Sequence, residues 1–191
     1  MNQQFCFEKL NLEGAYLIDP FVAYDERGYF IKDYSKDVFE KNNLAHDLQE
    51  VFYTCSKSGV IRAIHFQRVM QQPKLVRCVV GQVYDVIVDL RKNSHTFGKW
   101  QGFWLSEENK KEIYVPAGFG HGYLVVKDSV VSYKCSQKFF GEYDDGIVWN
   151  DPDLGIEWPL ERVGQLVLSE KDRNLQSFSS FKDKNEGGFI V

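Results

Sequence analysis

The stretch from Ser58 to Asp89, SGVIRAIHFQRVMQQPKLVRCVVGQVYDVIVD, predicts a β-fold. Its β-branched and apolar residues favour two strands around a loop, with Lys74 opening the second strand and a third strand after Gly81. Strand alternation puts Arg62 and His65 on opposite faces. The strands of this stretch carry Arg62, His65, Lys74, Asp85 and Asp89, which are costly to bury unless they are paired. These residues are either exposed polar side chains together with one core histidine whose hydrogen bonds are satisfied, or they form a functional site.

The flanking chain extends the β pattern from Gln49 to about residue 135. Short strands are separated by turn signals at Ser58-Gly59, Gly81, Asn93-Ser94, Gly98, Asn109 and Gly118. Many short strands without alternating helices predict an all-β sandwich or barrel. Residues 5–18 suggest two N-terminal strands and residues 35–45 a helix, whereas residues 144–164 suggest irregular chain. We expect one domain over residues 1–191, with an irregular tail after about residue 177.

Composition narrows the class of protein. The 191 residues suit one core, and the 15% aromatic content suits a β-rich interior. A net charge of −4 gives no electrostatic case for a nucleic-acid partner, and no apolar run is long enough to span a membrane. The four cysteines, Cys6, Cys55, Cys78 and Cys135, have no zinc spacing. We therefore expect reduced thiols and a cytoplasmic protein.

A second motif, YVPAGFGHGY, returns His121 to the mouth of a barrel, as metal-binding jelly rolls do for one ligand. Such sites need further ligands, usually two His and a carboxylate on an earlier strand. Beside His65, however, the next residue on the same face is Gln67. His46 and His95 lie apart from these strands. The pattern therefore predicts no metal and no other cofactor.

A third motif, VSYKC, places Tyr133 in a strand, where a buried hydroxyl needs a partner. The alternative is a core tyrosine with its hydroxyl at the rim. A histidine backed by a carboxylate is a base near neutral pH. A tyrosine can return a proton from the opposite face, and a lysine can stabilise an oxyanion. This set of residues suits epimerisation or isomerisation through an enolate.

Several sequence blocks, which follow one another in the same order as in the family, resemble the dTDP-4-dehydrorhamnose 3,5-epimerase family. They are DERGYF, GVIRAIHFQ, KLVRCVVGQVYDVIVDLRKNSHTFGKW, LSEENKKEIYVPAGFGHGYLVV, SYKCS, WNDPDLGIEWP and LSEKD. The resemblance covers about residues 24–172. It implies a double-stranded β-helix, a cupin-like jelly roll, that needs no cofactor and is usually a homodimer. It also implies epimerisation of a nucleotide-linked 4-keto-6-deoxy sugar for deoxysugar or polysaccharide biosynthesis.

The resemblance also implies roles for individual residues. His65 matches the catalytic base, Asp172 its acidic partner, Tyr133 the proton donor and Lys74 the residue that stabilises the enolate at C4. Asp85 and His121 match conserved pocket positions. Arg27 and Arg62 match arginines that bind the diphosphate, to which a planar guanidinium is well suited.

The chain departs from the family pattern mainly at ligand-binding positions. Ala63 replaces a glycine, Lys32 a glutamate and Phe139 a nucleotide-side tyrosine. A Gln-x-Asn-x-Ser run is replaced by Glu50, Phe52 and Thr54, and the loop from His65 to Lys74 is one residue shorter. These departures leave the nucleotide (dTDP, CDP or GDP) and the inverted carbon (C3, C5 or both) open.

Three alternatives remain beside the epimerase. A sugar 3,4-ketoisomerase on the same fold would move the ketone rather than invert a carbon. A metal-dependent jelly-roll oxygenase would need the missing ligands. A sugar-nucleotide binding module would have no activity at all.

Overall fold

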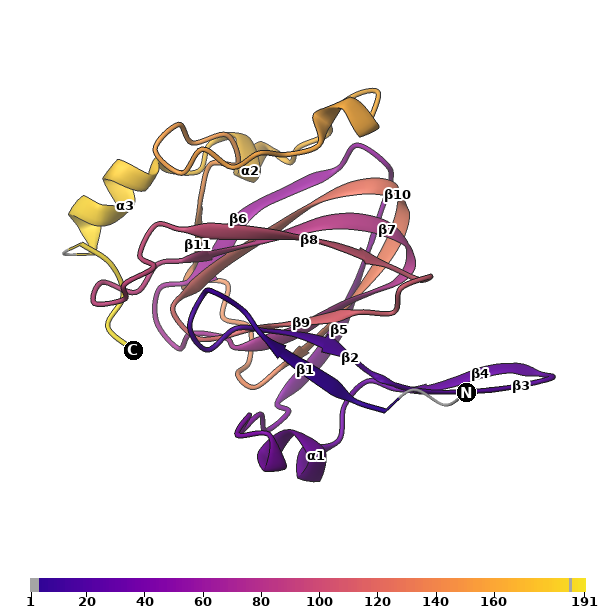
Figure 1. Cartoon of the computed structure of the whole chain (residues 1–191). Helices are drawn as coiled ribbons and strands as arrows, with labels where there is room; N and C mark the ends of the chain where they lie inside the picture. The colour runs from indigo at the N-terminus through magenta and orange to yellow at the C-terminus, as the bar shows by residue number, and fades with distance from the viewer. Residues whose placement is uncertain (1–3, 186) are drawn as a thin grey trace.

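The protein, seen as a computed structural model, is described over residues 4–185 and 187–191 (Figure 1). In chain order its elements are β1 (Cys6–Lys9), β2 (Tyr16–Asp19), β3 (Phe21–Asp25), β4 (Gly28–Lys32), α1 (Lys36–Lys41), β5 (Glu50–Ser56), β6 (Ile61–Gln67), β7 (Lys74–Asp89), β8 (Trp100–Ser106), β9 (Glu112–Val115), β10 (Phe119–Cys135), β11 (Asp144–Ile147), the 3₁₀ turn η1 (Leu160–Arg162), α2 (Glu170–Arg173) and α3 (Phe178–Lys184).

Two long strands, β7 and β10, pair antiparallel and belong to both layers of the fold. Residues 74–77 of β7 pair with β9, and residues 82–88 pair with β8. Likewise, β10 pairs with β6 near its start and with β5 near its end. One layer is therefore β1-β2-β9-β7-β10-β5, and the other is β8-β7-β10-β6-β11. Figure 1 shows the layers facing each other, which confirms the predicted jelly roll.

Strand β7 bends at Gly81. The sequence predicts a strand boundary there, but β7 continues through it. Gly81 has a φ of +78°, and a Cβ atom would lie 2.1 Å from the carbonyl oxygen of Asp128, so the position requires glycine. The pairing with β10 shifts register nearby, between Val125 and Val131. Such irregularities bend strands, and the bend carries β7 and β10 from one layer into the other.

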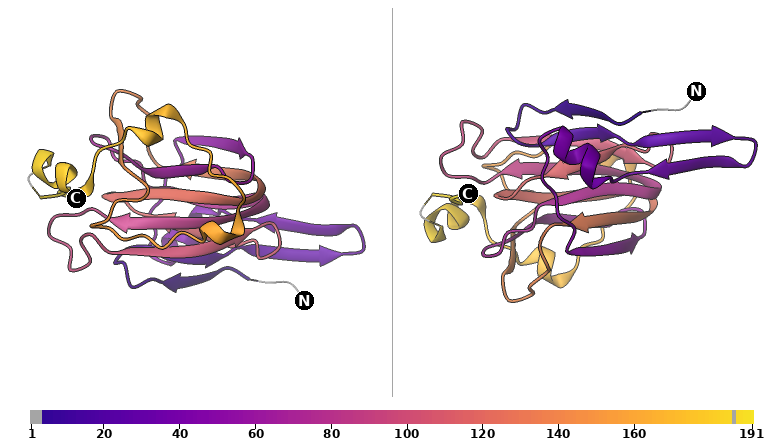
Figure 2. Two further views of the ribbon diagram at one scale, coloured as in Figure 1. Left: turned by 90° about the horizontal axis from the view of Figure 1, so that it is seen from above. Right: turned by 90° about the horizontal axis from the view of Figure 1, so that it is seen from below.

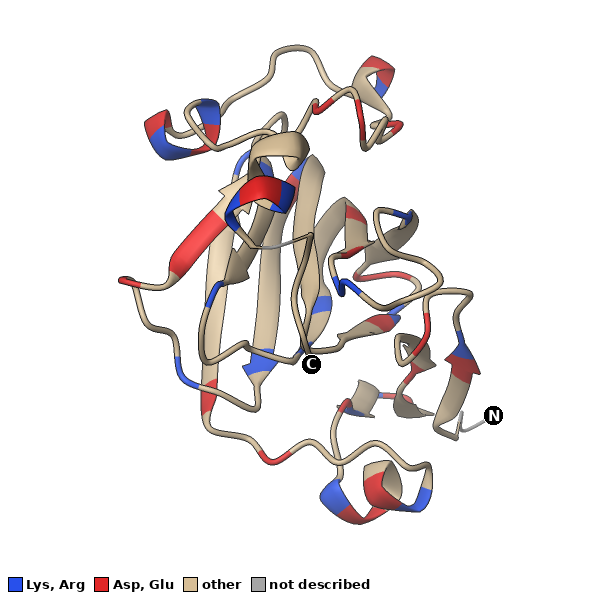
Figure 3. Cartoon of the chain, turned by 90° about the vertical axis from the view of Figure 1, so that its left-hand side faces the viewer, with Lys and Arg blue, Asp and Glu red and all other residues tan. Residues whose placement is uncertain are grey.

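Three apolar clusters hold the layers and their covering segments. The first lies between the layers and includes Ile87, Leu105 and Val131. The second lies under the C-terminal segment, and the third joins α1 to the β1-β2-β9 side. The predicted helix at residues 35–45 is present as the shorter α1, whose Phe39 is fully buried. Figure 3 shows both signs of charge on α1, as expected of its solvent-facing side.

The C-terminal part is more ordered than the sequence predicts. Residues 144–147, predicted as irregular chain, form β11 on the edge of β6. The prediction of an irregular tail after about residue 177 is wrong, because α3 occupies residues 178–184. Phe178 and Phe181 are buried there, and Phe189 packs in the same cluster. The spacing of three residues between Phe178 and Phe181 is typical of a helix, but the polar residues around them hid this pattern in the sequence.

The hairpin of β3 and β4 extends away from the barrel, as the two views of Figure 2 agree. It presents large aromatic side chains to solvent, because Tyr24, Tyr29 and Phe30 are each at least half exposed. An exposed apolar surface of this kind is typical of an interaction site.

No helix among residues 4–185 and 187–191 is long and apolar enough to cross a membrane.

Candidate active site

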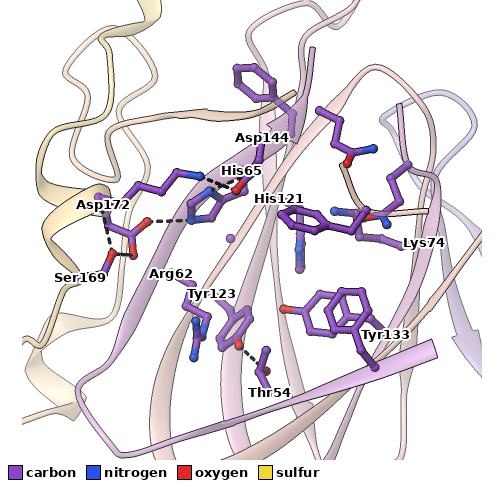
Figure 4. Close-up of a pocket in the computed structure, with 17 residues that line it drawn as sticks. Thr54, Arg62, His65, Lys74, His121, Tyr123, Tyr133, Asp144, Ser169 and Asp172 are labelled. Atoms are coloured by element: carbon purple, nitrogen blue, oxygen red, sulfur yellow. Dashed lines mark hydrogen bonds and ion pairs between the residues drawn. The ribbon is translucent and has the colours of Figure 1, made fainter. Parts of the chain in front are cut away.

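A cavity of about 320 Å³ opens between the two layers (Figure 4). Both layers and the C-terminal segment contribute to its wall. All four residues predicted to carry catalysis line it: His65 from β6, Lys74 from β7, Tyr133 from β10 and Asp172 from α2. The structure therefore brings together side chains that lie far apart in the sequence.

Strand β6 directs both Arg62 and His65 into the cavity, so the prediction that they lie on opposite faces is wrong. Arg62 pairs with Tyr123 and His65 with His121, which leaves one more residue on β6 than on β10 between the pairs. This bulge resets the alternation. Ile64 packs in the apolar cluster under the C-terminal segment instead.

His65 is paired with Asp172. The Nε2 atom of His65 lies 2.7 Å from Oδ1 of Asp172. Ser169 is the N-cap of α2, and its hydroxyl both accepts from the Asp172 amide and donates to Asp172 Oδ2 at 2.8 Å. Burial raises the pKa of Asp172, but bonding to His65 and Ser169 outweighs burial and lowers the pKa overall. The carboxylate is therefore ionised and held against the ring.

Two further charged residues near His65 escape prediction from the sequence. Asp144 Oδ1 lies 3.9 Å from His65 Nδ1, and Lys171 forms an ion pair with Asp144. Lys171 stands next to Asp172 in the LSEKD block, which is the only signal for it. Asp144 has none, because its proximity depends on the pairing of β11 with β6.

Tyr133 lies on the opposite wall from His65 (Figure 4). It belongs to the part of β10 that pairs with β5, and its ring stacks on Phe52 at 4.7 Å between centroids. Burial raises the pKa of the Tyr133 hydroxyl well above its ordinary value, and the Tyr123 hydroxyl raises it further. Tyr133 therefore keeps its proton until a strong base forms beside it. The stacking by Phe52 holds the ring in place.

Lys74 and His121 complete the polar lining. Burial lowers the pKa of Lys74, although Cys135, Asp144 and Asp85 oppose this effect. His121 Nε2 is hydrogen-bonded to Asp85 Oδ2 at 2.9 Å. Asp85 is fully buried behind His121 and does not line the cavity, so it orients His121 rather than meeting a ligand.

The predicted substrate-binding residues separate into two groups. Arg62, His121, Phe52 and Phe139 line the cavity, whereas Asp85, Glu50 and Arg27 do not. Ser56 accepts hydrogen bonds from Nε and Nη2 of Arg62, which steadies the guanidinium. Glu50 accepts the amide proton of Phe139 at 2.9 Å, and so supports the rim of the cavity.

Arg27 lies outside the cavity of its own chain. It sits at the turn of the β3–β4 hairpin, with 84% of its side chain exposed and an ion pair to Asp25. Lys32 lies on the same hairpin, where its ammonium group is 5.9 Å from the Phe21 ring centroid. The side chain of Ala63 lies outside what the structure describes.

Metal ligands are not assembled in the described residues. Within residues 4–185 and 187–191, no three His, Cys, Asp or Glu side chains lie close enough to hold an ion. Around the cavity, His65 and His121 each face a single carboxylate at hydrogen-bond distance.

His65 paired with a carboxylate, the Tyr133 hydroxyl on the opposite wall and Lys74 in the same cavity are the groups that an isomerase moving protons at carbon requires. The profile of the dTDP-4-dehydrorhamnose 3,5-epimerase family matches residues 9–180. The chain belongs to this family.

Individual relatives of the chain are enzymes of the same family. The dTDP-4-dehydrorhamnose 3,5-epimerase of Methanothermobacter thermautotrophicus is 49% identical over 90% of this chain and 93% of its own. The enzyme of that name from Pseudomonas aeruginosa is 41% identical over 90% and 94%. The crystal structure of dTDP-6-deoxy-D-glucose-3,5-epimerase from Legionella pneumophila, in complex with dTDP-4-keto-L-rhamnose, superposes with a TM-score of 0.91. It is 31% identical and covers 98% of this chain and 100% of its own.

Proposed function

We propose that the chain is a single catalytic domain that inverts C3 and C5 of dTDP-4-dehydro-6-deoxy-glucose. The observation that carries this proposal is the placement of His65, paired with Asp172, and Tyr133 on opposite walls of one cavity. A sugar ring between them would present one face to each residue. Lys74 would meet the ketone oxygen at C4.

The chemistry proceeds in two proton transfers for each carbon. His65 removes the proton from a carbon next to the C4 ketone, and the electron pair moves onto the ketone oxygen. Lys74 stabilises the resulting enolate, with an effect strengthened by the low polarity that lowers its own pKa. Tyr133 then donates its proton to the same carbon from the other face. The carbon is inverted, and the ketone is restored.

Substrate binding has support from several lining residues. The Arg62 guanidinium has donors beyond those given to Ser56, and these suit a diphosphate. Phe139 is half exposed at the rim, where an aromatic ring can stack on a nucleotide base.

We also propose a homodimer. The exposed aromatic residues of the β3–β4 hairpin need a cover, and a second copy of the chain would supply it. Arg27 cannot meet the diphosphate in its own cavity, since it stands on this extended hairpin. It would act in the cavity of the partner subunit.

The working compartment in this proposal is the cytoplasm. All four cysteines are free thiols, and two of them, Cys6 and Cys55, are exposed. Exposed thiols suit a reducing compartment.

The deciding experiment uses a panel of dTDP-, CDP- and GDP-linked 4-keto-6-deoxy sugars in deuterated water, followed by NMR. We expect deuterium at C3 and C5 of the dTDP sugar, with both centres inverted. Exchange at one carbon would make the chain a C3-only or C5-only epimerase, and preference for another nucleotide would change the substrate. Movement of the ketone would indicate a ketoisomerase. Binding without any exchange would overturn the proposal in favour of a binding module.

A further inference from the structure

Two loops form part of the rim of the cavity. The first rim loop, residues 68–73, joins β6 to β7, and the second rim loop, residues 136–143, joins β10 to β11. Each contributes one residue to the cavity wall, Gln72 from the first and Phe139 from the second. Phe139 is 51% exposed and has no hydroxyl group that could anchor its ring. The position of the ring therefore depends on how the second rim loop is held.

Gln67, the last residue of β6, connects the two rim loops. Its side chain is buried, and its Nε2 atom donates to the carbonyl oxygen of Met70 at 2.7 Å and to that of Lys138 at 3.2 Å. Its Oε1 atom accepts the amide proton of Phe140. The two carbonyls need a donor and the amide needs an acceptor, so the three partners fix the orientation of the Gln67 side chain.

The hydrogen bonds to the second rim loop converge on Phe139. The peptide unit before Phe139 is held at both polar groups, because Gln67 binds the Lys138 carbonyl and Glu50 accepts the Phe139 amide proton at 2.9 Å. The peptide unit after Phe139 is held through the Phe140 amide, which also donates to Gln67. Side chains from β5 and β6 therefore fix the backbone on both sides of this half-exposed ring.

The first rim loop is tied to the same arrangement. Met70 has a φ of +53°, a left-handed conformation that residues other than glycine rarely adopt. Such a conformation persists where the surroundings hold it, and here the Met70 carbonyl is bound by Gln67. Nearby, the buried Gln72 donates from Nε2 to the carbonyl oxygen of Gln137 at 2.9 Å. The two rim loops are thus fastened together as one unit.

We propose that Gln67 is a positioning residue for nucleotide binding, which holds the Phe139 ring as a preformed platform for the base. The inference rests on the nucleotide of the proposed function. A ring that is already in place loses little conformational freedom when the base stacks on it, so more of the stacking energy appears as affinity. Gln67 gives both protons of its Nε2 group to loop carbonyls, so it acts through Phe139 rather than on the sugar.

The test is calorimetric titration with dTDP, together with steady-state kinetics on the dTDP sugar. Gln67→Met keeps the length of the side chain and removes all three hydrogen bonds. We expect the Kd for dTDP to rise by roughly five- to a hundredfold, the range that corresponds to the loss of one base–aromatic stack. KM should rise with it, whereas kcat should stay close to wild type, because the proton-transfer groups His65, Lys74 and Tyr133 are unchanged.

A double variant shows whether Gln67 acts through Phe139. Phe139→Ala removes the platform and should weaken dTDP binding at least as much as Gln67→Met. Adding Gln67→Met to Phe139→Ala should cause no further loss, since no ring is left to position. Losses that multiply in the double variant would show that Gln67 supports binding by another route, and would overturn the proposal.

Further variants separate positioning from a general loss of stability. Glu50→Met removes the acceptor of the Phe139 amide from a different strand, so it tests the same platform should Gln67→Met fail to fold. We expect a smaller rise in the Kd for dTDP, because one hydrogen bond of three is lost, and Glu50→Gln should recover the affinity by restoring an acceptor. Gln71→Met makes the same change in a first-loop residue that does not line the cavity, and should bind dTDP as wild type does.

Two further results would overturn the inference alone. One is wild-type affinity for dTDP in both Gln67→Met and Glu50→Met. The other is a fall in kcat at unchanged affinity for dTDP, which would mean that Gln67 positions the neighbouring His65 instead. Failure of the proposed function is distinct: the wild-type protein would bind dTDP and invert no sugar, and the variants would still decide the platform. A wild-type protein that binds no dTDP would overturn both.

Discussion

The imidazole of His65 on strand β6 and the carboxylate of Asp172 on helix α2 meet at 2.7 Å. The contact joins the barrel to its C-terminal covering segment. Ser169 caps α2 and fixes the carboxylate. The orientation of the proposed base, His65, therefore depends on how the last part of the chain docks onto β6.

Replacing the base should abolish the reaction. In His65→Asn, we expect neither inversion nor solvent exchange, with a loss of at least about a hundredfold, because general base catalysis contributes about 10²–10⁴-fold. Deuterium uptake by NMR and steady-state rates would measure both effects. His95→Asn is the matched control, since His95 is exposed and lies outside the cavity. Substantial exchange in His65→Asn would show that another group is the base.

Replacing the donor should separate exchange from inversion. In Tyr133→Phe, His65 still removes a proton and can return it to the same face. We expect deuterium at C3 or C5 with retained configuration and little inverted product. Thermal or urea unfolding should show a loss of about 1 kcal/mol, because the ring still stacks on Phe52 and only one hydroxyl is lost. Inversion at the wild-type rate would make Tyr133 a core residue.

Mixing the weakened Arg27→Ala variant with the inactive His65→Ala variant should raise activity at low substrate concentration above that of either variant alone if Arg27 acts across a dimer. A mixed dimer of Arg27→Ala and His65→Ala contains one cavity with both side chains intact. Light scattering should show a dimer for each variant alone. For Arg27→Ala we expect KM to rise roughly ten- to hundredfold, as hydrogen bonds to charged groups contribute about 1.5–3 kcal/mol.

The same mixture can fail in an informative way. If Arg27 served only its own chain, neither cavity of the mixed dimer would be intact, and the mixture would show no gain at low substrate concentration over Arg27→Ala alone. A monomer at low concentration would contradict the dimer directly.

Activity should not depend on a metal. The two cavity histidines each have one carboxylate at hydrogen-bond distance, which is too few ligands for a stable site. We therefore expect full activity after exhaustive treatment with chelators, measured together with metal analysis of the treated protein. Stoichiometric iron, zinc or nickel whose removal stops the reaction would contradict the proposed mechanism.

Stability should fall with rising pH because of Glu112. Burial raises its pKa to about 7, while Lys134 opposes the rise; Asp33 and Arg77 are the other charged groups that face it. The folded protein therefore holds a proton that the unfolded chain releases above its ordinary pKa of 4.5. The contribution is complete below that pKa and is lost as the pH rises through about 7.

The variant Glu112→Gln removes this dependence. Urea unfolding at pH 5, 6, 7 and 8 should show wild-type stability falling relative to the variant by an amount on the order of a few kcal/mol, since one pKa unit corresponds to about 1.4 kcal/mol. A difference that stays constant over this range would show that Glu112 does not titrate there. Taking the difference between the two proteins cancels the other titrating groups.

The sequence predicts local features well where the pattern is local. Strand alternation and turn residues around β5 to β10 indicate the jelly roll, and the blocks containing His65, Lys74, Tyr133 and Asp172 identify residues that do share one cavity. The predictions that are wrong have physical causes. A bulge in β6 resets the alternation between Arg62 and His65, and bulges depend on the partner strand. Gly81 marks a bend inside β7 rather than its end.

The sequence by itself determined the fold class and the chemical types at the site, because alternation, turn preference and side-chain chemistry are local properties. Only the tertiary structure decided which groups touch. It set Asp144 beside His65 and Tyr123 beside Thr54, and it moved Arg27 out of its own cavity. These relations arise from pairing between distant strands and from the docking of whole segments. Such long-range contacts are not encoded at any one position of the chain.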